Sequence, residues 1–142
     1  MMLKVVDMTL TLVLGGVIKM KYKSQGEENI AEALEKNNIE FIYENPLFIM
    51  ETREGEEGIK PRIWYPDFWL PEYGIVIEFF GGKSKNYKKG VRHKKMNYKK
   101  LKIDLIPVHS WTTKENLEPY LLKEIQKIID SKRKIFDNRD KK

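Results

Sequence analysis

The stretch PDFWLPEYGIVIEFF, residues 66–80, decides the fold. The four letters PEYG in its middle are typical of a turn. We therefore predict a strand on either side of this turn, over 62–70 and 75–80. The second strand is apolar on both faces, which is typical of the central strand of a sheet. If Leu70 faces Ile75 across the turn, the two strands form an antiparallel hairpin.

Two acids of this hairpin occupy positions where burying a carboxylate is costly. Asp67 has aromatic neighbours on its strand, and Glu78 stands in the most apolar strand of the chain. In the register above the two residues are directly opposite, which would place their Cβ atoms about 4.5–5.5 Å apart. A divalent cation between the two carboxylates would remove their mutual repulsion. The alternative is that either acid pairs with Arg62, with Lys60 or with a backbone donor.

A third acid lies on a helix that we predict upstream. The segment Ser24-Gln25-Gly26-Glu27 has the spacing of a capping box, and Asn37-Asn38 ends the helical pattern. Glu27 falls on the core-facing side, three and four residues before Ile30 and Ala31. It either contributes to a metal site or completes the capping box, and the sequence leaves both readings open.

A basic helix is predicted downstream, over 86–101. Its sheet-facing side follows steps of four, three, four and three: Tyr87, Val91, Lys94, Tyr98 and Leu101. Lys94 is thus the lysine expected to point toward the strand of Glu78, with Lys95 beside the same face. Otherwise the stem of Lys94 covers the core while its ammonium reaches solvent. Seven further cations are expected to hold phosphates: Lys83, Lys85, Lys88, Lys89, Arg92, Lys99 and Lys100.

Charge is divided unevenly along the 142 residues. The net charge is +6, but residues 1–82 carry 8 Lys/Arg against 14 Asp/Glu, and residues 83–142 carry 19 against 7. From Lys83 to Lys102 there are ten basic residues and no acid. A basic segment beside an acidic half favours a polyanion as partner, most commonly a nucleic acid. A solvated, Lys-rich surface is the alternative.

Composition excludes several classes of site. The chain has no Cys and only two His, which rules out disulfides, a thiol nucleophile and Cys-ligated metals, and argues against a His-built zinc site. Its most apolar stretch, residues 10–18, is shorter than the roughly 20 residues of a membrane span. Asp7 before this stretch, and the lack of a small-residue cleavage site after it, argue against a secretory signal. We therefore expect an intracellular protein without a membrane partner.

The overall pattern predicts one α/β domain in three parts. Residues 1–23 would form a β-hairpin around Gly15-Gly16, residues 24–129 the core, and residues 130–142 a charged tail that frays. Further strands are predicted over 39–43, 47–51 and 103–108, and an amphipathic helix over 116–129. The expected core is αβββαβ, with a central mixed sheet flanked by helices.

Taken together, these residues resemble the PD-(D/E)xK nuclease superfamily. Pro66-Asp67, with Glu78 eleven residues after the aspartate, is similar to its paired acids, and the start of the first helix at 24–30 is similar to that of several branches. The motif is most similar to small endonucleases of the very-short-patch-repair type. The resemblance covers residues 24–108 and implies a restriction-endonuclease-like fold.

The resemblance has one departure, which concerns the lysine of the motif. The family carries a lysine two residues after its second acid, and Phe80 stands there in this chain. Some branches supply the lysine from the following helix instead. Lys94 matches such a migrated position, with Lys95 in reserve. If neither lysine reaches the acids, a degenerate binding domain is the expected reading.

By this resemblance the chain would be a Mg²⁺- or Mn²⁺-dependent endodeoxyribonuclease. Asp67 and Glu78 would bind the metal, assisted by Glu27 and by the main-chain carbonyl of Phe79, and Lys94 would orient the attacking water. The partner would be DNA, or RNA, cut with structure-directed or weak sequence preference, and cutting both strands would call for a homodimer. The alternatives are a catalytically inactive nucleic-acid-binding module and a protein-interaction domain with a basic tail.

Overall fold

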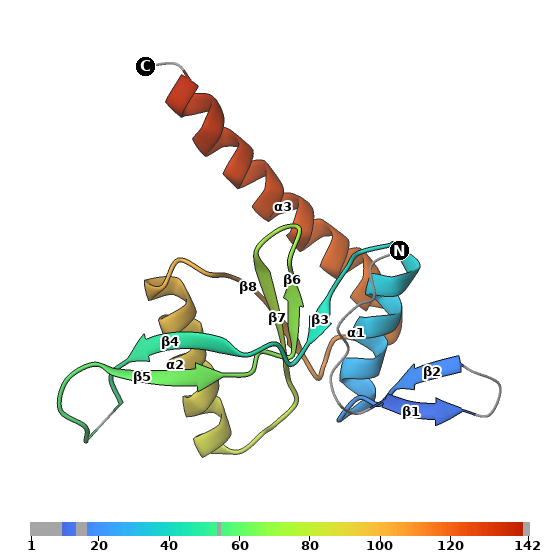
Figure 1. The fold of residues 1–142 in the computed structure, drawn as a ribbon, viewed down its shortest axis with the longest axis horizontal. Helices are drawn as coiled ribbons and strands as arrows, with labels where there is room; N and C mark the ends of the chain where they lie inside the picture. Colours follow the sequence, from blue (N-terminus) through green and yellow to red (C-terminus); the bar gives the residue numbers. More distant parts are fainter. Residues whose placement is uncertain (1–9, 14–16, 54, 141–142) are drawn as a thin grey trace.

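The computed structural model of the chain describes residues 10–13, 17–53 and 55–140. It contains both helices and strands, shown in Figure 1. The helices are α1 (Gln25–Lys36), α2 (Lys85–Lys100) and α3 (Lys114–Asp140). The strands are β1 (Leu10–Val13), β2 (Val17–Met20), β3 (Ile42–Tyr43), β4 (Leu47–Glu51), β5 (Lys60–Trp64), β6 (Phe68–Leu70), β7 (Ile75–Phe80) and β8 (Asp104–His109).

The central sheet has four strands in the order β3-β6-β7-β8. The β6–β7 pair is antiparallel with Leu70 opposite Ile75, which confirms the predicted register of the hairpin. The β7–β8 pair is parallel, so the sheet is mixed, as predicted. The apolar strand β7 lies between two neighbours, as its composition indicated. The elements that build the sheet and its cover follow in the order α1-β3-β6-β7-α2-β8-α3.

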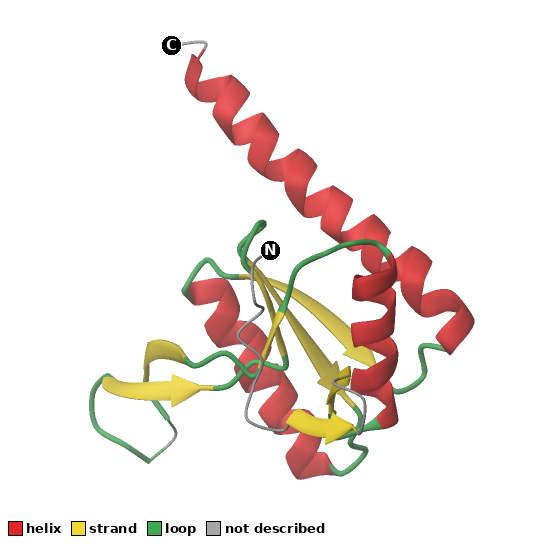
Figure 2. Cartoon of the chain, turned by 45° about the vertical axis from the view of Figure 1, so that its right-hand side comes forward, coloured by secondary structure: helices red, strands yellow, loops and turns green. Residues whose placement is uncertain are grey.

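Alternation along β7 divides its side chains between the two faces of the sheet. Ile75 and Ile77 belong to the apolar core, to which α1 contributes Ile30 and Leu34. The long helix α3 adds Leu117, Leu121 and Ile125 to the same core. Glu78 lies on the opposite face, where α2 packs (Figure 2). β7 is covered by helices on both faces, which is why it is apolar except at Glu78.

The strand predicted over 62–70 is in fact two strands in two different sheets. β5 ends at Trp64 and pairs with β4 in a separate hairpin, whereas β6 begins at Phe68 in the central sheet. Pro66 lies between them, and it lacks the N–H that a continuous ladder would need. The β4–β5 hairpin extends across α2 (Figure 1). The strand predicted over 39–43 is likewise shorter, because only Ile42–Tyr43 pairs with β6.

The last helix is longer than predicted. Instead of ending at 129, α3 continues to Asp140, so residues 130–140 of the charged tail are helical rather than frayed. Its outer half extends away from the body of the molecule (Figure 1). Three apolar residues of the first half already anchor the helix in the core, and the second half continues from them without a break.

The N-terminal hairpin is present over the described residues. β1 and β2 pair antiparallel, with Leu10 opposite Met20 and Val13 opposite Val17. The predicted turn at Gly15-Gly16 lies outside the described residues. None of the helices in the described part of the chain is long and apolar enough to cross a membrane.

Candidate functional site

Three acids meet at one end of the central sheet. Asp67 directly precedes β6, and Glu78 lies near the end of the antiparallel strand β7. The Phe68–Ile77 pair is the last of this ladder, so one step further along brings Asp67 to the level of Glu78. Glu27, in the first turn of α1, also lies close to Asp67. Its charge, like that of Glu78, raises the pKa of Asp67.

The carboxyl group of Asp67 has too little positive charge around it. Burial is the main reason that its pKa rises to about 8, and the neighbouring charges of Glu78 and Glu27 add to the rise. One backbone donor opposes this: the N–H of Phe79 donates to Oδ2 of Asp67 at 2.7 Å. A single N–H does not offset burial beside two acids. Asp67 is therefore the group of this cluster that would gain most from a bound cation.

Glu78 is held by two side chains of α2. The ammonium of Lys94 lies 2.9 Å from its Oε2, and the hydroxyl of Tyr98 donates to its Oε1 at 3.1 Å. The Glu78 side chain is only 2% exposed. Burial, followed by the charge of Glu78, raises the pKa of Tyr98, so its hydroxyl stays protonated and remains a donor. Lys94 thus occupies the inward position that the helix pattern predicted.

Lys95, the reserve position, points elsewhere. Its ammonium lies 3.3 Å from Nε2 of His109 and 5.7 Å from the centre of the Phe80 ring. It is the neighbour of Lys94 in sequence, but it faces the end of β8 instead of the acids. Of the two candidate lysines, the structure brings only Lys94 to Glu78.

Glu27 is buried and bonded, but not as a complete capping box. The hydroxyl of Ser24 accepts from the N–H of Glu27 at 3.1 Å, which is one half of that motif. The carboxylate of Glu27 accepts instead from the Tyr43 hydroxyl at 2.7 Å and from the N–H of Lys23 at 3.1 Å. Burial, and next this bond to Glu27, raises the pKa of Tyr43. The carboxylate is thus directed toward the sheet, as a contribution to a metal site would require.

The glycine before Glu27 sets the distance between α1 and β7. A Cβ atom on Gly26 would lie 2.3 Å from the ring of Phe79, which no real contact allows. Only glycine lets the first turn of α1 lie on the aromatic ring at the end of β7. The same Phe79 donates its N–H to Asp67, so Gly26 brings the helix that carries Glu27 onto the strand that orients Asp67.

The chemistry of these donors suits a hard divalent cation. Within the described ranges, no three Asp, Glu or His side chains form a group that could hold a metal as they stand. Mg²⁺, however, is usually bound by one or two carboxylates together with waters and substrate phosphates. Asp67 and Glu78 supply such a pair. The carbonyl of Phe79 is directed to the same edge as its N–H, because the two backbone groups of a strand residue point to one side.

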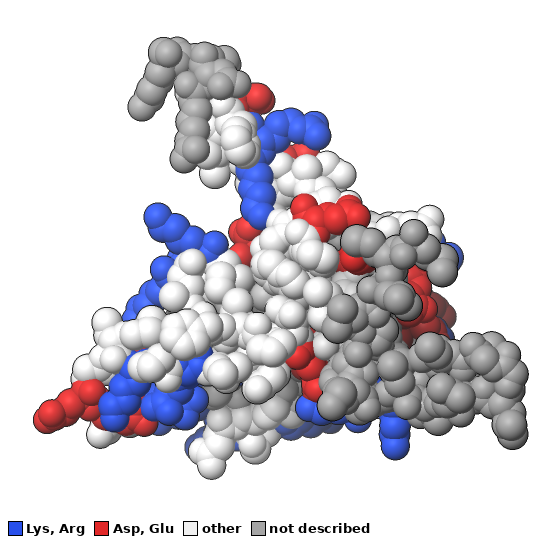
Figure 3. Space-filling model, in the orientation of Figure 1, with Lys and Arg blue, Asp and Glu red and all other residues white. Residues whose placement is uncertain are grey.

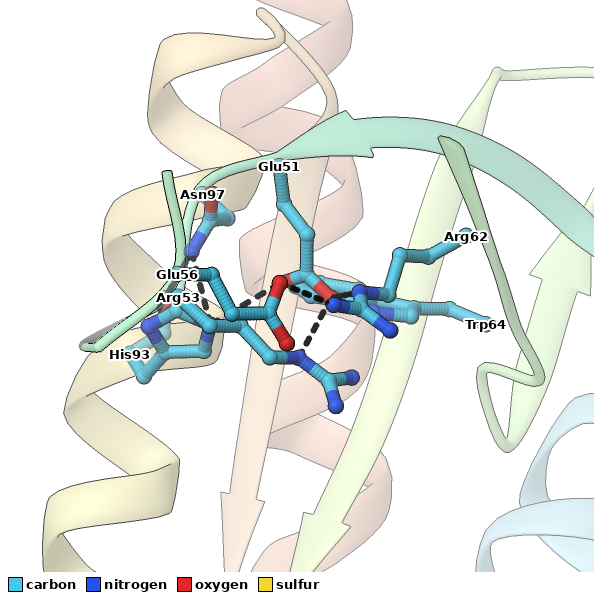
Figure 4. A network of polar contacts seen from close by, with 7 residues as sticks. All are labelled: Glu51, Arg53, Glu56, Arg62, Trp64, His93 and Asn97. Atoms are coloured by element: carbon cyan, nitrogen blue, oxygen red, sulfur yellow. Dashed lines mark hydrogen bonds and ion pairs between the residues drawn. The ribbon is translucent and has the colours of Figure 1, made fainter. Parts of the chain in front are cut away.

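A second polar cluster, which sequence reasoning missed, surrounds Glu51 (Figure 4). Its carboxylate is fully buried and lies 2.9 Å from Nε of Arg53, 3.3 Å from Nε of Arg62 and 2.9 Å from Nε2 of His93. The indole of Trp64 donates to the same carboxylate at 3.3 Å. Although burial opposes ionisation, the bonds from His93, Trp64 and Arg53 hold the pKa of Glu51 below its usual value.

The Glu51 cluster fixes the β4–β5 hairpin on α2. Glu51 and Trp64 come from the hairpin, and His93 comes from the helix. Trp64 also packs edge-on against Tyr98, with ring centres 5.3 Å apart. Because Tyr98 in turn donates to Glu78, the β4–β5 hairpin supports the acid site through Trp64 and Tyr98. Ile49 is apolar and lies two residues before Glu51, so the two side chains share one side of β4. This alternation is the sequence signal that could have marked Glu51 as buried.

The sequence left open that Asp67 or Glu78 pairs with Arg62, with Lys60 or with a backbone donor. Neither acid pairs with Arg62, but a backbone N–H does donate to Asp67. Arg62 pairs with Glu51 and with Glu56 instead of Asp67 or Glu78. Lys60 stands opposite Glu51 in the β4–β5 ladder, away from the central sheet. The backbone donor that the alternative allowed is the N–H of Phe79. This one donor does not offset burial and the charges of Glu78 and Glu27, which together raise the pKa of Asp67 to about 8.

The predicted phosphate-binding cations are all exposed. They lie before α2, in its first turns and in its last turn: Lys83, Lys85, Lys88, Lys89, Arg92, Lys99 and Lys100. Figure 3 shows blue atoms beside α2 and the β4–β5 hairpin, red atoms at the tip of that hairpin, and both colours along α3. On this face the basic charge is therefore concentrated beside α2, whereas α3 carries both signs.

Comparison with protein-family models, with curated proteins and with solved structures gives no match. What the chain does must therefore be argued from the residues of the site. These are two adjacent carboxylates with a third beside them, one lysine on the second acid, and a basic surface along the helix that carries this lysine.

Proposed function

We propose that the chain is a metal-dependent endodeoxyribonuclease. One observation carries the proposal: Asp67 and Glu78 lie side by side at the end of a central hairpin, and Lys94 reaches Glu78 from the following helix. The order of the elements and the mixed sheet support the resemblance to PD-(D/E)xK nucleases. In that family two acids and one lysine at this place act on phosphodiester bonds.

The acids would hold Mg²⁺ or Mn²⁺ together with the substrate. Asp67 has the greater need of a cation, since burial and two neighbouring acids raise its pKa to about 8. Glu78 and the Phe79 carbonyl would complete the protein's share, with Glu27 acting directly or through a water. When bound, the ion lowers the pKa of a coordinated water and stabilises charge on the phosphate oxygens.

Lys94 would have two tasks. It pairs with the buried carboxylate of Glu78 beside Asp67. Its ammonium also carries further N–H donors, which can orient a water or a phosphate oxygen next to the acids. A lysine that comes from α2 can do this as well as one on β7, because its ammonium reaches the same carboxylate.

The exposed cations along α2 would bind the phosphodiester backbone. Contacts of this kind carry no sequence information, which fits cleavage directed by DNA structure. Binding should weaken with salt by a log–log slope of about −0.9 for each phosphate neutralised on a duplex. Arg92 and the exposed lysines at both ends of α2 are the residues expected to set this slope.

The test is cleavage of a labelled panel of single-stranded, duplex, flap and four-way-junction DNA, with Mg²⁺, Mn²⁺ or EDTA. We expect metal-dependent cutting that falls by at least about a hundredfold in Asp67→Asn and Glu78→Gln. The matched control is Glu72→Gln, which changes an exposed acid in the turn at the other end of the same hairpin. An Asp67→Asn protein that cuts like the wild type, or cutting that persists in EDTA, would overturn the proposal.

One observation favours a second function, a binding module that does not cut. Lys94 and Tyr98 already satisfy both oxygens of Glu78, which leaves Asp67 to compete alone for a cation. Such a module would bind DNA through α2 equally well with and without metal. Binding without cleavage in either metal, on every member of the panel, would select this function.

A further inference from the structure

A shallow pocket of about 220 Å³ lies where α2 begins and β8 ends. Phe80, Tyr87 and Trp111 are among the residues that line it. β7 and β8 are parallel, so both strands end on this side of the sheet, and α2 starts directly after β7. In open α/β sheets, ligands bind outside the carboxyl ends of parallel strands, and β7 and β8 form such a pair here.

Three rings are arranged in series from the core to the surface of this pocket. Phe80 is 5% exposed and contacts His109, with ring centres 5.6 Å apart. His109 in turn stacks flat on Trp111, with centres 4.1 Å apart and an angle of 4° between the planes. Trp111 is 75% exposed. One face of its indole is therefore backed by a second ring, and the other is open to a ligand.

The pocket walls are fixed by the backbone. The N–H of Ser110 donates to the carbonyl of Phe80, and the N–H of Thr112 donates to the carbonyl of His109, which holds the turn that carries Trp111. On the other side, the N–H of Gly81 donates to the hydroxyl of Tyr87. The indole is thus a preformed platform.

The surroundings of the platform are basic. Lys88 and Arg92 line the pocket, Lys95 lies beside His109, and no acid is among the described residues that line it. Burial, and then the charge of Lys95, lower the pKa of His109, so its ring is neutral at pH 7 and stacks as a plain aromatic. The ligand that matches this pocket has a flat ring and a negative charge close to it.

The pocket adjoins the acid cluster. Phe80 and Glu78 lie on the same face of β7, two residues or about 6.6 Å apart along the strand. Lys94 and Lys95 are neighbours on α2, and the first reaches Glu78 while the second reaches His109. A strand whose phosphate lies at the acids would therefore have a neighbouring nucleotide at the platform.

We propose that this pocket takes an unpaired nucleobase of DNA, stacked on Trp111, with the adjoining phosphates held by Lys88 and Arg92. The proposal rests on the proposed function and narrows its substrate to DNA with unpaired bases: single strands, flaps or frayed ends. A base inside a duplex has both faces covered by its neighbours and cannot stack on the indole. Stacking of bases on aromatic side chains is tolerant of sequence, in agreement with weak sequence preference.

The test is fluorescence anisotropy of labelled oligothymidylate and of a blunt duplex, in EDTA, so that binding is measured without cleavage. Trp111→Ala should weaken binding of the single strand about tenfold and that of the duplex less than about twofold. Trp111→Phe, which keeps an aromatic ring, should retain most of the affinity for the single strand that Trp111→Ala loses. The matched control is Phe136→Ala, another exposed aromatic, on the outer half of α3, which should change neither affinity.

An abasic oligonucleotide of the same length adds a second arm. The wild type should bind it about tenfold more weakly than oligothymidylate, and Trp111→Ala should weaken this binding no further. Equal losses on single strand and duplex, or an unchanged affinity of Trp111→Ala for oligothymidylate, would overturn the pocket.

Cleavage of the same substrates separates this inference from the proposed function. If no DNA is cut in any metal but the loss in Trp111→Ala remains specific for unpaired bases, the nuclease proposal fails and the pocket stands. If Asp67-dependent cutting is found and Trp111→Ala binds and cuts every substrate like the wild type, the pocket fails and the nuclease stands.

Discussion

The ammonium of Lys94 on α2 lies 2.9 Å from Oε2 of Glu78 on β7, although the two residues are sixteen positions apart. A lysine two residues after the acid would have to extend from the position of Phe80, which is buried against His109. The chain thus combines an aromatic end of β7 with a lysine delivered by the neighbouring helix. Lys94 and one wall of the pocket beside Trp111 both come from α2.

Replacing Lys94 should remove cleavage. Lys94→Met keeps much of the stem but leaves the buried Glu78 with only Tyr98 as a partner. We expect a loss of at least about a hundredfold in single-turnover rate and a loss of stability of about 2–3 kcal/mol, because one partner of a partly buried pair is gone. Lys95→Met, the change at the next residue, should cut within about threefold of the wild type. Comparable rates for the two variants would contradict the role of Lys94.

The ionisation of Asp67 should make the folded protein less stable as the pH rises. Its pKa is about 8 in the folded chain and near 3.8 when exposed, so the folded state binds more protons between these values. The stability that the protonated group contributes is therefore complete below about pH 4 and is lost as the pH rises toward 8. Asp67→Asn carries no charge to bury and keeps an oxygen that can accept from Phe79. We expect the variant to melt at least about 3 °C above the wild type at pH 8.

The matching measurement is thermal unfolding without metal at pH 5 and at pH 8. The gain of Asp67→Asn over the wild type should be clearly larger at pH 8 than at pH 5. The control variants Glu72→Asp and Glu72→Gln change an exposed acid. Their melting temperatures should therefore change with pH in the same way as that of the wild type. A gain for Asp67→Asn that is equal at both pH values would show that Asp67 is not the titrating group.

Metal should stabilise the chain through the same residue. A divalent cation that binds only the folded state adds about 2.7 kcal/mol at a concentration a hundredfold above its Kd. We expect Mg²⁺ or Mn²⁺ to raise the melting temperature more at pH 8 than at pH 5, since the cation competes with the proton on Asp67. In Asp67→Asn the rise should disappear. A rise that is equal in this variant would place the metal somewhere else.

Much of the central sheet could be predicted because its signals are local. The apolar run of β7, the turn before it and the step pattern of α2 indicated the register of the hairpin and the inward position of Lys94. These features depend only on residues within one or two elements. The hairpin then determines which residues stand opposite one another, and this is how the Asp67–Glu78 pair followed from the sequence.

What could not be predicted depends on contacts between distant elements. The segment 62–70 has a continuous strand pattern, yet it changes sheets at Pro66. The Glu51 cluster joins β4 to α2 through Glu51 and His93, which are 42 positions apart, so no local spacing marks this contact. The stack of His109 on Trp111 likewise needs a turn whose geometry β7 helps to fix. Charged residues beyond 129 suggested fraying, but a helix with a well-anchored first half can extend its polar second half into solvent.

The Glu51 carboxylate should be important for stability. Glu51→Gln leaves Arg53, Arg62 and His93 around a neutral group, and we expect a loss of about 2 kcal/mol or more in the free energy of unfolding. The pKa of Glu51 is depressed, so this contribution is present above its usual pKa and is lost as the pH falls below it. Chemical denaturation at pH 7 measures the effect, and Glu57→Gln, at an exposed acid of the β4–β5 loop, is the control. Equal midpoints for the two variants would contradict a structural role of the cluster.

Two glycines in helices should respond in opposite directions to the same substitution. Gly26→Ala places a methyl group 2.3 Å from the Phe79 ring, and Phe79 orients Asp67 through its N–H, so we expect a stability loss of about 1–3 kcal/mol together with lower cleavage. Gly90 stands inside α2 with nothing within 4 Å of a Cβ, so Gly90→Ala should stabilise the chain by about 0.5–1 kcal/mol and leave cleavage unchanged.

A double variant decides whether the ring is the cause. Phe79→Leu offers a smaller side chain beside Gly26, so Gly26→Ala should cost less in that background, and cleavage should recover in part. Urea denaturation and single-turnover cleavage of all four proteins measure the coupling. If the cost of Gly26→Ala is the same with Phe79 and with Leu at 79, the first turn of α1 is not positioned by this ring. The placement of Glu27 beside Asp67 would then need another explanation.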